Sequence, residues 1–201
     1  MKLEKRECIV LAGGFGTRLK SIVNDRPKCL ALINPPGLPF LNLLLGYLIK
    51  NNFNKIIFSL GFMNEKIIDY LNNCTISIEI EYVIENVPLG TGGGIKKAIN
   101  IASSENVLII NADTFFDVNI DNLYFEHSKC NAICSIALKK MINFDRYGTV
   151  TLKKNKIQNF EEKRRMRKGL INGGVILLNK SKFLSFDLSD KFSFESDFFK
   201  C

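Results

Sequence analysis

Residues 7–19, ECIVLAGGFGTRL, decide the fold that the sequence predicts. The first five of them form a short, mostly apolar run, which is typical of a buried strand, and two glycines, Gly13 and Gly14, follow it. Glycine allows positive φ and lets backbone amides come close to a ligand, so a glycine turn after a strand can bind phosphate oxygens. Arg18 adds a permanently charged planar fork that suits phosphate. The segment therefore predicts a strand followed by an anion-binding turn, although such a turn alone could be purely structural.

Two common glycine motifs do not fit this segment. A dinucleotide fingerprint that used Gly14 and Gly16 would need glycine or alanine where Leu19 stands. A Walker loop would need Gly-Lys followed by Ser or Thr, and the chain has no such tripeptide. The turn is therefore neither of the usual nucleotide-binding loops.

Strand and helix patterns alternate over the first part of the chain, and strands dominate after residue 130. We expect strands at residues 7–11, 55–60, 75–83, 107–110, 132–138, 149–152, 156–160 and 174–178, and helices at residues 39–51, 64–71 and 92–102. This order predicts an α/β fold with a single Rossmann-like mixed sheet flanked by helices. No segment has the composition of a linker, so residues 1–201 are expected to form one domain.

The chain has 201 residues, of which 46% are hydrophobic and 24% charged, which excludes disordered, collagen-like and low-complexity classes. The net charge is +8, and the excess of basic residues lies in residues 1–50 and 151–201. This distribution indicates an anionic ligand between the two ends of the chain, although lysines could merely cover a surface. We expect no nucleic acid, because the chain has neither zinc-finger spacing nor an aromatic RNP pattern.

The most apolar stretch, residues 38–49, is shorter than the roughly 20 residues that span a bilayer, so we expect no membrane segment. The six cysteines form no CxxC pair, and Cys8 and Cys134 read as small buried hydrophobes, which favours the reducing cytoplasm. His127 is the only histidine, so catalytic triads that use any other histidine are excluded. We expect His127 at the polar end of a helix, on the surface.

Further polar and glycine-rich segments follow the first turn. Pro27 and Lys28 come within ten residues of Arg18, and PLGTGGG at residues 88–94 is a second glycine turn that opens a helix. Asp113 follows a buried strand, at the edge of the sheet where α/β proteins bind ligands. The sequence therefore predicts one site that holds cations, glycine amides and a carboxylate.

These motifs together resemble the sugar-phosphate nucleotidyltransferase family. Residues 11–19 with Lys28 look like its nucleotide-binding signature, and residues 88–93 look like its base-contacting loop. The resemblance continues in order through RYG at 146–148, FEEK at 160–163 and INGG at 171–174. PLGTGG at 88–93, FDRYG at 144–148 and LINGG at 170–174 look closest to the D-glycero-α-D-manno-heptose 1-phosphate guanylyltransferases.

The resemblance implies a GT-A-like nucleotidyltransferase with a nucleotide-binding half at about residues 1–115 and a sugar-phosphate-binding half at about 116–201. It implies GTP and a sugar 1-phosphate as substrates, Mg²⁺ as cofactor, and a nucleotide-sugar for surface polysaccharide or glycan biosynthesis as product. It implies Arg18, Lys28 and Asp113 as catalytic residues, with Asp113 as the metal ligand. The nucleotide would contact Leu11, Ala12, Gly13, Gly14, Gly16, Thr17, Arg18, Leu89, Gly90 and Thr91. The sugar phosphate would contact Tyr147, Gly148, Glu162, Lys163, Asn172 and Gly173.

Several residues allow a plainer interpretation. Residues 92–94 could be only a helix start, but three glycines weaken a helix, so a closely approaching ligand is expected there. Asp117 and Asp121 could join Asp113 in a metal cluster, but we interpret Asp121 as a helix N-cap. Tyr147 could simply pack on the sheet. A further set is expected in a solvated loop: Arg164, Arg165, Arg167 and Lys168.

The chain also departs from the family pattern. Ala112 stands where the family commonly has glycine, and a second metal-binding aspartate is expected on a strand beyond residue 201. Phe194, Phe198 and Phe199 have helical spacing without a helix stop, so a C-terminal strand and helix are expected to be missing. Three alternatives stay open: another sugar such as mannose 1-phosphate, another base (UTP, dTTP or CTP), or a non-catalytic nucleotide-binding protein.

Overall fold

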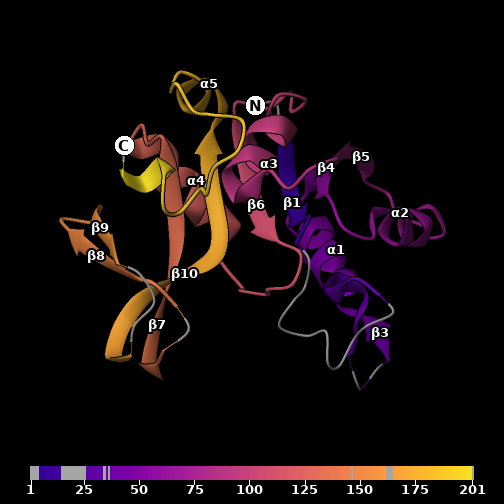
Figure 1. Ribbon diagram of the computed structural model, residues 1–201, viewed down its shortest axis with the longest axis horizontal. Coiled ribbons are helices and arrows are strands. Elements are labelled where there is room, and N and C mark those ends of the chain that lie inside the picture. The colour runs from indigo at the N-terminus through magenta and orange to yellow at the C-terminus, as the bar shows by residue number, and fades with distance from the viewer. Residues whose placement is uncertain are drawn as a thin grey trace.

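The computed structural model describes residues 5–14, 26–33, 35, 37–145, 147–161 and 165–200, and the fold is built from these (Figure 1). Its main sheet has the strand order β5-β4-β1-β6-β10-β8-β9, and β7 pairs with β10 beside this path. The strands are β1 (Arg6–Ala12), β4 (Phe53–Leu60), β5 (Glu79–Ile84), β6 (Asn106–Asn111), β7 (Cys134–Phe144), β8 (Thr149–Lys153), β9 (Lys156–Glu161) and β10 (Met166–Asn179), with a small separate hairpin of β2 (Leu32–Ile33) and β3 (Leu38–Pro39).

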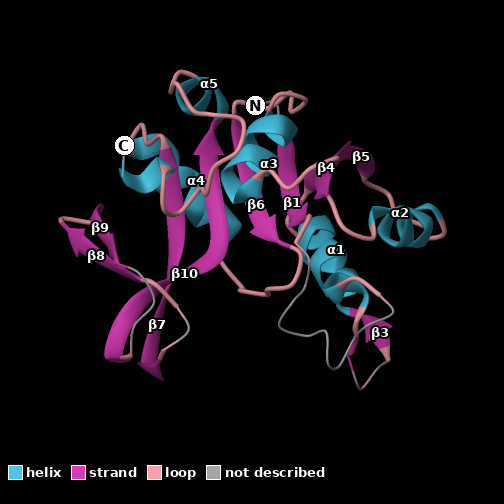
Figure 2. Ribbon diagram, in the orientation of Figure 1, coloured by secondary structure: helices cyan, strands magenta, loops and turns pink. Residues whose placement is uncertain are grey.

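The helices are α1 (Phe40–Lys50), α2 (Asn64–Asn72), α3 (Gly90–Ile99), α4 (Ile120–Lys129) and α5 (Lys180–Leu184), with 3₁₀ turns η2 (Lys28–Leu30) and η3 (Phe198–Lys200). In Figure 2, α1 and α2 lie at one end of the molecule and the β8–β9 hairpin lies at the other. None of the helices in the described part of the chain combines the length and the apolar character needed to cross a membrane.

The sheet is mixed because its two halves connect differently. β1, β4, β5 and β6 are parallel, and each is joined to the next of them along the chain by a connection that contains a helix. β10 runs antiparallel to β6 and to β7. The prediction of an α/β fold with a mixed sheet flanked by helices is confirmed.

The core has one hydrophobic cluster on each face of the sheet, because successive strand side chains point to opposite faces. Cys8 and Val10 of β1 pack into the cluster that holds the buried residues of α1 and α2. Ile9 packs into the other cluster, with α3 and with the phenylalanines of the C-terminal segment. The aromatic rings of those phenylalanines pack against one another, and the rings of Phe194 and Phe198 stack with their centroids 4.9 Å apart. Of the three residues with helical spacing, Phe198 and Phe199 belong to the short η3, and Phe194 precedes it.

The structure differs from the placements that the sequence predicted for Asp121, Arg167 and Lys168. The N-cap of α4 is Asn119, whose side chain accepts a hydrogen bond from the Asn122 amide. Asp121 lies in the first turn of α4 and accepts a hydrogen bond from Arg6. Arg167 and Lys168 belong to β10 rather than to a loop. Asp121 therefore does not serve as the cap of α4.

His127 is buried, with 2% of its surface exposed, so its expected surface position is also wrong. Its Nδ1 lies 2.8 Å from Ser135 Oγ on β7, while its Nε2 is buried without a hydrogen bond among the described residues. Burial, and then the positive charge of Lys182, lowers the pKa of His127 below its ordinary value. The fold therefore holds this imidazole in its neutral form.

We expect His127 to make the folding stability depend on pH. Because its folded pKa is lowered, the unfolded chain takes up the proton first, so the free energy of unfolding falls as pH drops below about 6.5. Above that pH the residue contributes no slope. His127→Asn keeps a polar atom near Ser135 but cannot titrate, so urea unfolding should show a shallower decline from about pH 7 to about pH 5. Equal slopes for both proteins would contradict the assignment.

Candidate active site

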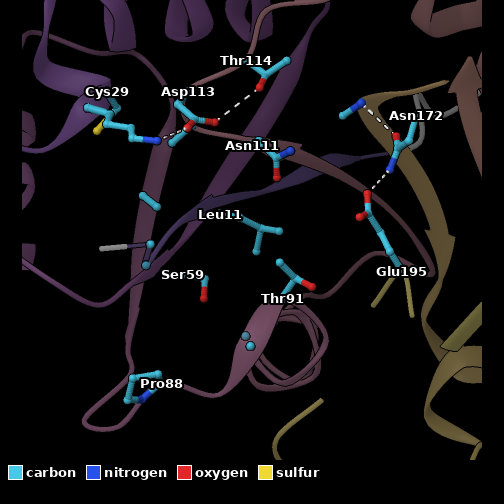
Figure 3. A pocket seen from close by; sticks show the side chains of 18 of the residues that line it. Leu11, Cys29, Ser59, Pro88, Thr91, Asn111, Asp113, Thr114, Asn172 and Glu195 are labelled. Carbon is cyan, nitrogen blue, oxygen red and sulfur yellow. Dashed lines mark hydrogen bonds and ion pairs between the residues drawn. The ribbon is translucent and has the colours of Figure 1, made fainter. Parts of the chain in front are cut away.

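A cavity of about 770 Å³ opens at the carboxyl ends of the parallel strands and reaches across to β10 (Figure 3). It brings together most of the predicted site residues that the structure describes: Leu11, Ala12, Gly13, Gly14, Lys28, Gly90, Thr91, Asp113, Tyr147, Gly148 and Asn172. Leu89 and Gly173 do not line it. Five predicted residues, Gly16, Thr17, Arg18, Glu162 and Lys163, lie outside the described part of the chain and stay predictions.

The cavity forms here because β1 and β6 end side by side. Leu11 is in register with Asn111, and the amide of Ala112 donates to the Leu11 carbonyl over 3.0 Å. The glycine turn after β1 and Asp113 after β6 therefore leave the sheet at the same edge. This is the position at which parallel α/β sheets bind ligands.

Lys28 and Asp113 meet at one side of this cavity. Lys28 Nζ lies 3.2 Å from Asp113 Oδ2, and the Thr114 hydroxyl donates to Asp113 Oδ1 over 3.3 Å. The side chains of Lys28 and Asp113 are 25% and 45% exposed, so both charges can reach a ligand in the cavity. At this distance the ammonium could bind a phosphate group while the carboxylate binds the cation that accompanies the phosphate.

Asp113 could hold a metal ion in this cavity. The described residues contain no group of three or more metal-binding side chains, so Asp117 and Asp121 do not form a cluster with it. Mg²⁺ is commonly bound through one or two carboxylates, with substrate phosphates and waters as its other ligands. The exposed Asp113 carboxylate beside the glycine turn therefore fits Mg²⁺.

Sequence reasoning missed Glu85, which lines the cavity on the side of α3. Its Oε1 accepts a hydrogen bond from Ser59 Oγ over 3.0 Å, and its Oε2 accepts from the Leu89 amide over 3.1 Å. A Cβ on Gly94 would lie 2.8 Å from Glu85 Oε1, so the glycine there makes room for the carboxylate. The two hydrogen bonds fix the carboxylate and leave acceptor positions on its oxygens.

Gly92 and Gly93 make room for the protein itself rather than for a ligand. A Cβ on Gly92 would lie 2.1 Å from the Phe192 ring, and one on Gly93 would lie 2.2 Å from the Asp190 carbonyl oxygen. The Gly92 amide donates to the Phe192 carbonyl, and the Phe192 amide donates to the Leu89 carbonyl, both over 3.0 Å. The expectation of a ligand against these two glycines is wrong, whereas Gly94 does line the cavity.

Gly92→Ala is therefore expected to destabilise the protein. The new methyl group must displace the buried Phe192 ring, and such overpacking costs about 1–3 kcal/mol, more than the gain in helix propensity of about 1 kcal/mol. Gly46→Ala is the matched control, because that helix position has no atom within 4 Å of the new Cβ. The urea midpoint should fall for the first variant and rise for the second. Equal rises would contradict the packing of residues 190–192 on α3.

A second carboxylate that sequence reasoning missed, Glu195, lies across the cavity beside Asn172 (Figure 3). Asn172 Nδ2 donates to Glu195 Oε1, and Asn172 Oδ1 accepts from the Gly174 amide, both over 2.9 Å. Tyr147 is half exposed and lines the same side, with its ring 6.4 Å from that of Phe144. This side of the cavity thus offers hydrogen-bonding groups rather than cations among its described residues.

Comparison with known proteins adds a family and close relatives. The family model described as nucleotidyl transferase matches residues 7–198. The chain is 44% identical to the D-glycero-alpha-D-manno-heptose 1-phosphate guanylyltransferase of Aneurinibacillus thermoaerophilus, over 96% of this chain and 83% of the relative. The protein of the same name from Campylobacter jejuni is also 44% identical, over 94% of this chain and 83% of its own length.

A solved structure is similar over almost the whole chain. The crystal structure of HddC from Yersinia pseudotuberculosis complexed with GMP-PN superposes with a TM-score of 0.84 at 34% identity. The match covers 97% of this chain and 85% of that one. The likeness therefore includes both sides of the cavity.

Proposed function

This chain belongs to the nucleotidyl transferase family, and on that premise we propose that it is a guanylyltransferase that joins GTP to D-glycero-α-D-manno-heptose 1-phosphate. The observation that carries the proposal is the 44% identity to two guanylyltransferases for this sugar phosphate, over at least 94% of the chain. The likeness to a structure complexed with GMP-PN supports a guanine nucleotide.

In the proposed reaction, an oxygen of the sugar 1-phosphate attacks the α-phosphorus of GTP. A new P–O–P bond forms, the bond between the α-phosphorus and the bridging oxygen breaks, and pyrophosphate leaves with that oxygen. The products are GDP-heptose and pyrophosphate. Such a reaction mainly requires positioning and neutralisation of charge. Gly13, Gly14 and Lys28 line the cavity. In this proposal the two glycine amides bind phosphate oxygens, and Lys28 neutralises charge near the α-phosphate.

We further propose Mg²⁺ as the cofactor, with the Asp113 carboxylate as its protein ligand. The donor set of one carboxylate fits an ion that keeps phosphate oxygens and waters as its other ligands. Bound there, the ion would neutralise phosphate charge at the reacting centre. Lys28, 3.2 Å from the same carboxylate, would then be released to bind phosphate.

Glu85 supports guanine as the base. The guanine ring presents N1–H and an exocyclic amino group as neighbouring donors, and a carboxylate accepts hydrogen bonds at both of its oxygens. Glu85 lies against the glycine turn after β1, because a Cβ on Gly13 would be 3.0 Å from its Oε1. Its carboxylate can therefore meet a base that enters the cavity on the side of α3.

The setting of the reaction is also a proposal. We place it in the reducing cytoplasm, in keeping with the free cysteines among the described residues, and assign its product to surface polysaccharide or glycan biosynthesis.

The test is a pyrophosphate-release assay with Mg²⁺ that pairs five nucleotides (ATP, GTP, CTP, UTP and dTTP) with heptose, mannose and glucose 1-phosphates. We expect release to require GTP and the heptose phosphate. Release with another pair would overturn the base or the sugar while keeping the reaction. Binding of GTP without release from any pair would favour a non-catalytic nucleotide-binding protein.

A further inference from the structure

The carboxylate of Glu195 is exposed, lines the cavity and accepts a hydrogen bond from the protein. Among the described residues, its one hydrogen-bonding partner is Asn172, which donates to Oε1. The Asn172 amide is itself oriented, because its Oδ1 accepts from the Gly174 amide. Asn172 therefore presents its NH₂ group to Glu195, and the carboxylate keeps further acceptor positions directed to the cavity.

The chain around Glu195 is anchored to the opposite wall. The Phe194 amide donates to Thr91 Oγ1 over 3.0 Å, and the Phe194 side chain is buried among phenylalanine rings. Upstream, the backbone of Phe192 pairs with α3, and Lys96 binds Asp190 over 2.9 Å. These contacts hold residues 190–195 in place, so the position of Glu195 does not depend on a loop that is free to move.

The charges of the cavity are arranged along its length. The Lys28 ammonium, paired with the Asp113 carboxylate, lies at the carboxyl ends of β1 and β6, and the Glu195 carboxylate lies beside β10. The Glu85 carboxylate also lines the cavity, on the side of α3. A sugar 1-phosphate carries its negative charge on the phosphate and neutral hydroxyl groups on the ring. Phosphate next to Glu195 would be repelled, whereas hydroxyls can donate hydrogen bonds to a carboxylate and gain from its charge.

On this ground we infer that Glu195 reads the sugar, by accepting hydrogen bonds from its hydroxyl groups and so directing the phosphate toward Lys28. The inference rests on the proposed function, since it supposes a sugar 1-phosphate in the cavity. It makes Glu195 a specificity-determining residue for an acceptor with free hydroxyls. Asn172 is the positioning residue that supports it.

Kinetics of Glu195→Ala and Glu195→Gln test the inference. Each variant should raise the KM for heptose 1-phosphate roughly 10- to 100-fold, because a hydrogen bond to a charged group is lost, and should leave the KM for GTP within about twofold. Asp187→Asn is the matched control, because that exposed carboxylate in the same region does not line the cavity. Thermal unfolding of each variant identifies loss of the fold, and Glu195→Gln retains an acceptor for Asn172. Unchanged sugar KM values in folded variants would overturn the inference.

Monodeoxy analogues of heptose 1-phosphate give a readout that a merely structural role would not move. In the wild type, removal of the hydroxyl that Glu195 binds should lower kcat/KM roughly 10-fold or more. In Glu195→Ala the same removal should cost nothing further, because its partner is already gone. If every deoxy analogue keeps its full penalty in the variant, Glu195 does not contact the sugar.

The two failures can be told apart. A wild type that turns over heptose 1-phosphate while the Glu195 variants match it would overturn the inference alone. A wild type without turnover on any pair would overturn the proposed function. In that case calorimetry with heptose 1-phosphate decides about Glu195: we expect at least tenfold weaker binding to Glu195→Ala, and equal or absent binding to both proteins would overturn the inference.

Discussion

Asp113→Asn is expected to lower the rate of GDP-sugar formation roughly 10²- to 10³-fold, the range found when one preorganised electrostatic group is removed from an active site. The amide has nearly the shape of the carboxylate but lacks its charge, so it binds a divalent cation poorly and no longer pairs with Lys28. The fold should persist, because an ion pair this exposed contributes at most about 1 kcal/mol.

Pyrophosphate release at increasing Mg²⁺ concentrations measures this effect. The wild type should saturate, whereas Asp113→Asn should stay slow and need far more Mg²⁺. Asp117→Asn is the control: it is an exposed carboxylate on the same loop that does not line the cavity, so it should behave as the wild type. A similar rate for Asp113→Asn and the wild type would remove Asp113 from the metal site.

Local patterns predicted most of the fold, because each element carries its own periodicity. The prediction of strands failed where residues are buried without forming the hydrogen bonds of a strand. Residues 75–83 were expected to form one strand, yet β5 starts at Glu79, and Ile76 and Ile78 pack into the core without strand pairing. Alternating isoleucines signal burial of one face, and burial does not require a neighbouring strand.

The burial of His127 could have been predicted from its spacing in the helix. It follows the buried Ile120 by seven residues, which is two helical turns, so both lie on one face of α4. The face that Ile120 buries against the sheet therefore takes His127 with it. Residue type favoured the surface, but helical position decided the outcome.

The site residues also divide into those that the sequence patterns predicted and those that they did not. Residues that follow a strand, such as Gly13 and Asp113, could be placed together because neighbouring parallel strands end at one edge. Glu85 and Glu195 belong to none of the sequence motifs, and their proposed roles rest on their places in the cavity and on contacts with Leu89 and Asn172. The packing of Phe192 against Gly92 joins segments far apart in sequence, which no local pattern encodes.

Glu85→Gln is expected to change base selectivity more than any other single substitution in the cavity. Glutamine keeps one acceptor oxygen but replaces the other with a donor, which would oppose the N1–H and amino group of guanine. We expect kcat/KM for GTP to fall roughly 100-fold, because one hydrogen bond to a charged acceptor is lost and one donor is left unpaired. UTP, which offers carbonyl acceptors beside its N3–H, should fall much less.

The comparison of GTP with ITP separates base reading from a structural role of Glu85. ITP lacks the exocyclic amino group but keeps N1–H, so the wild type should prefer GTP and Glu85→Gln should lose much of that preference. A carboxylate that only holds the Leu89 amide would, when replaced, weaken all nucleotides equally and leave the GTP to ITP ratio unchanged. Glu79→Gln is the control, since that carboxylate lies on β5, the strand that precedes Glu85, pairs with Lys55 and does not line the cavity. A ratio that stays at the wild-type value in Glu85→Gln would therefore assign guanine selection to another part of the cavity wall.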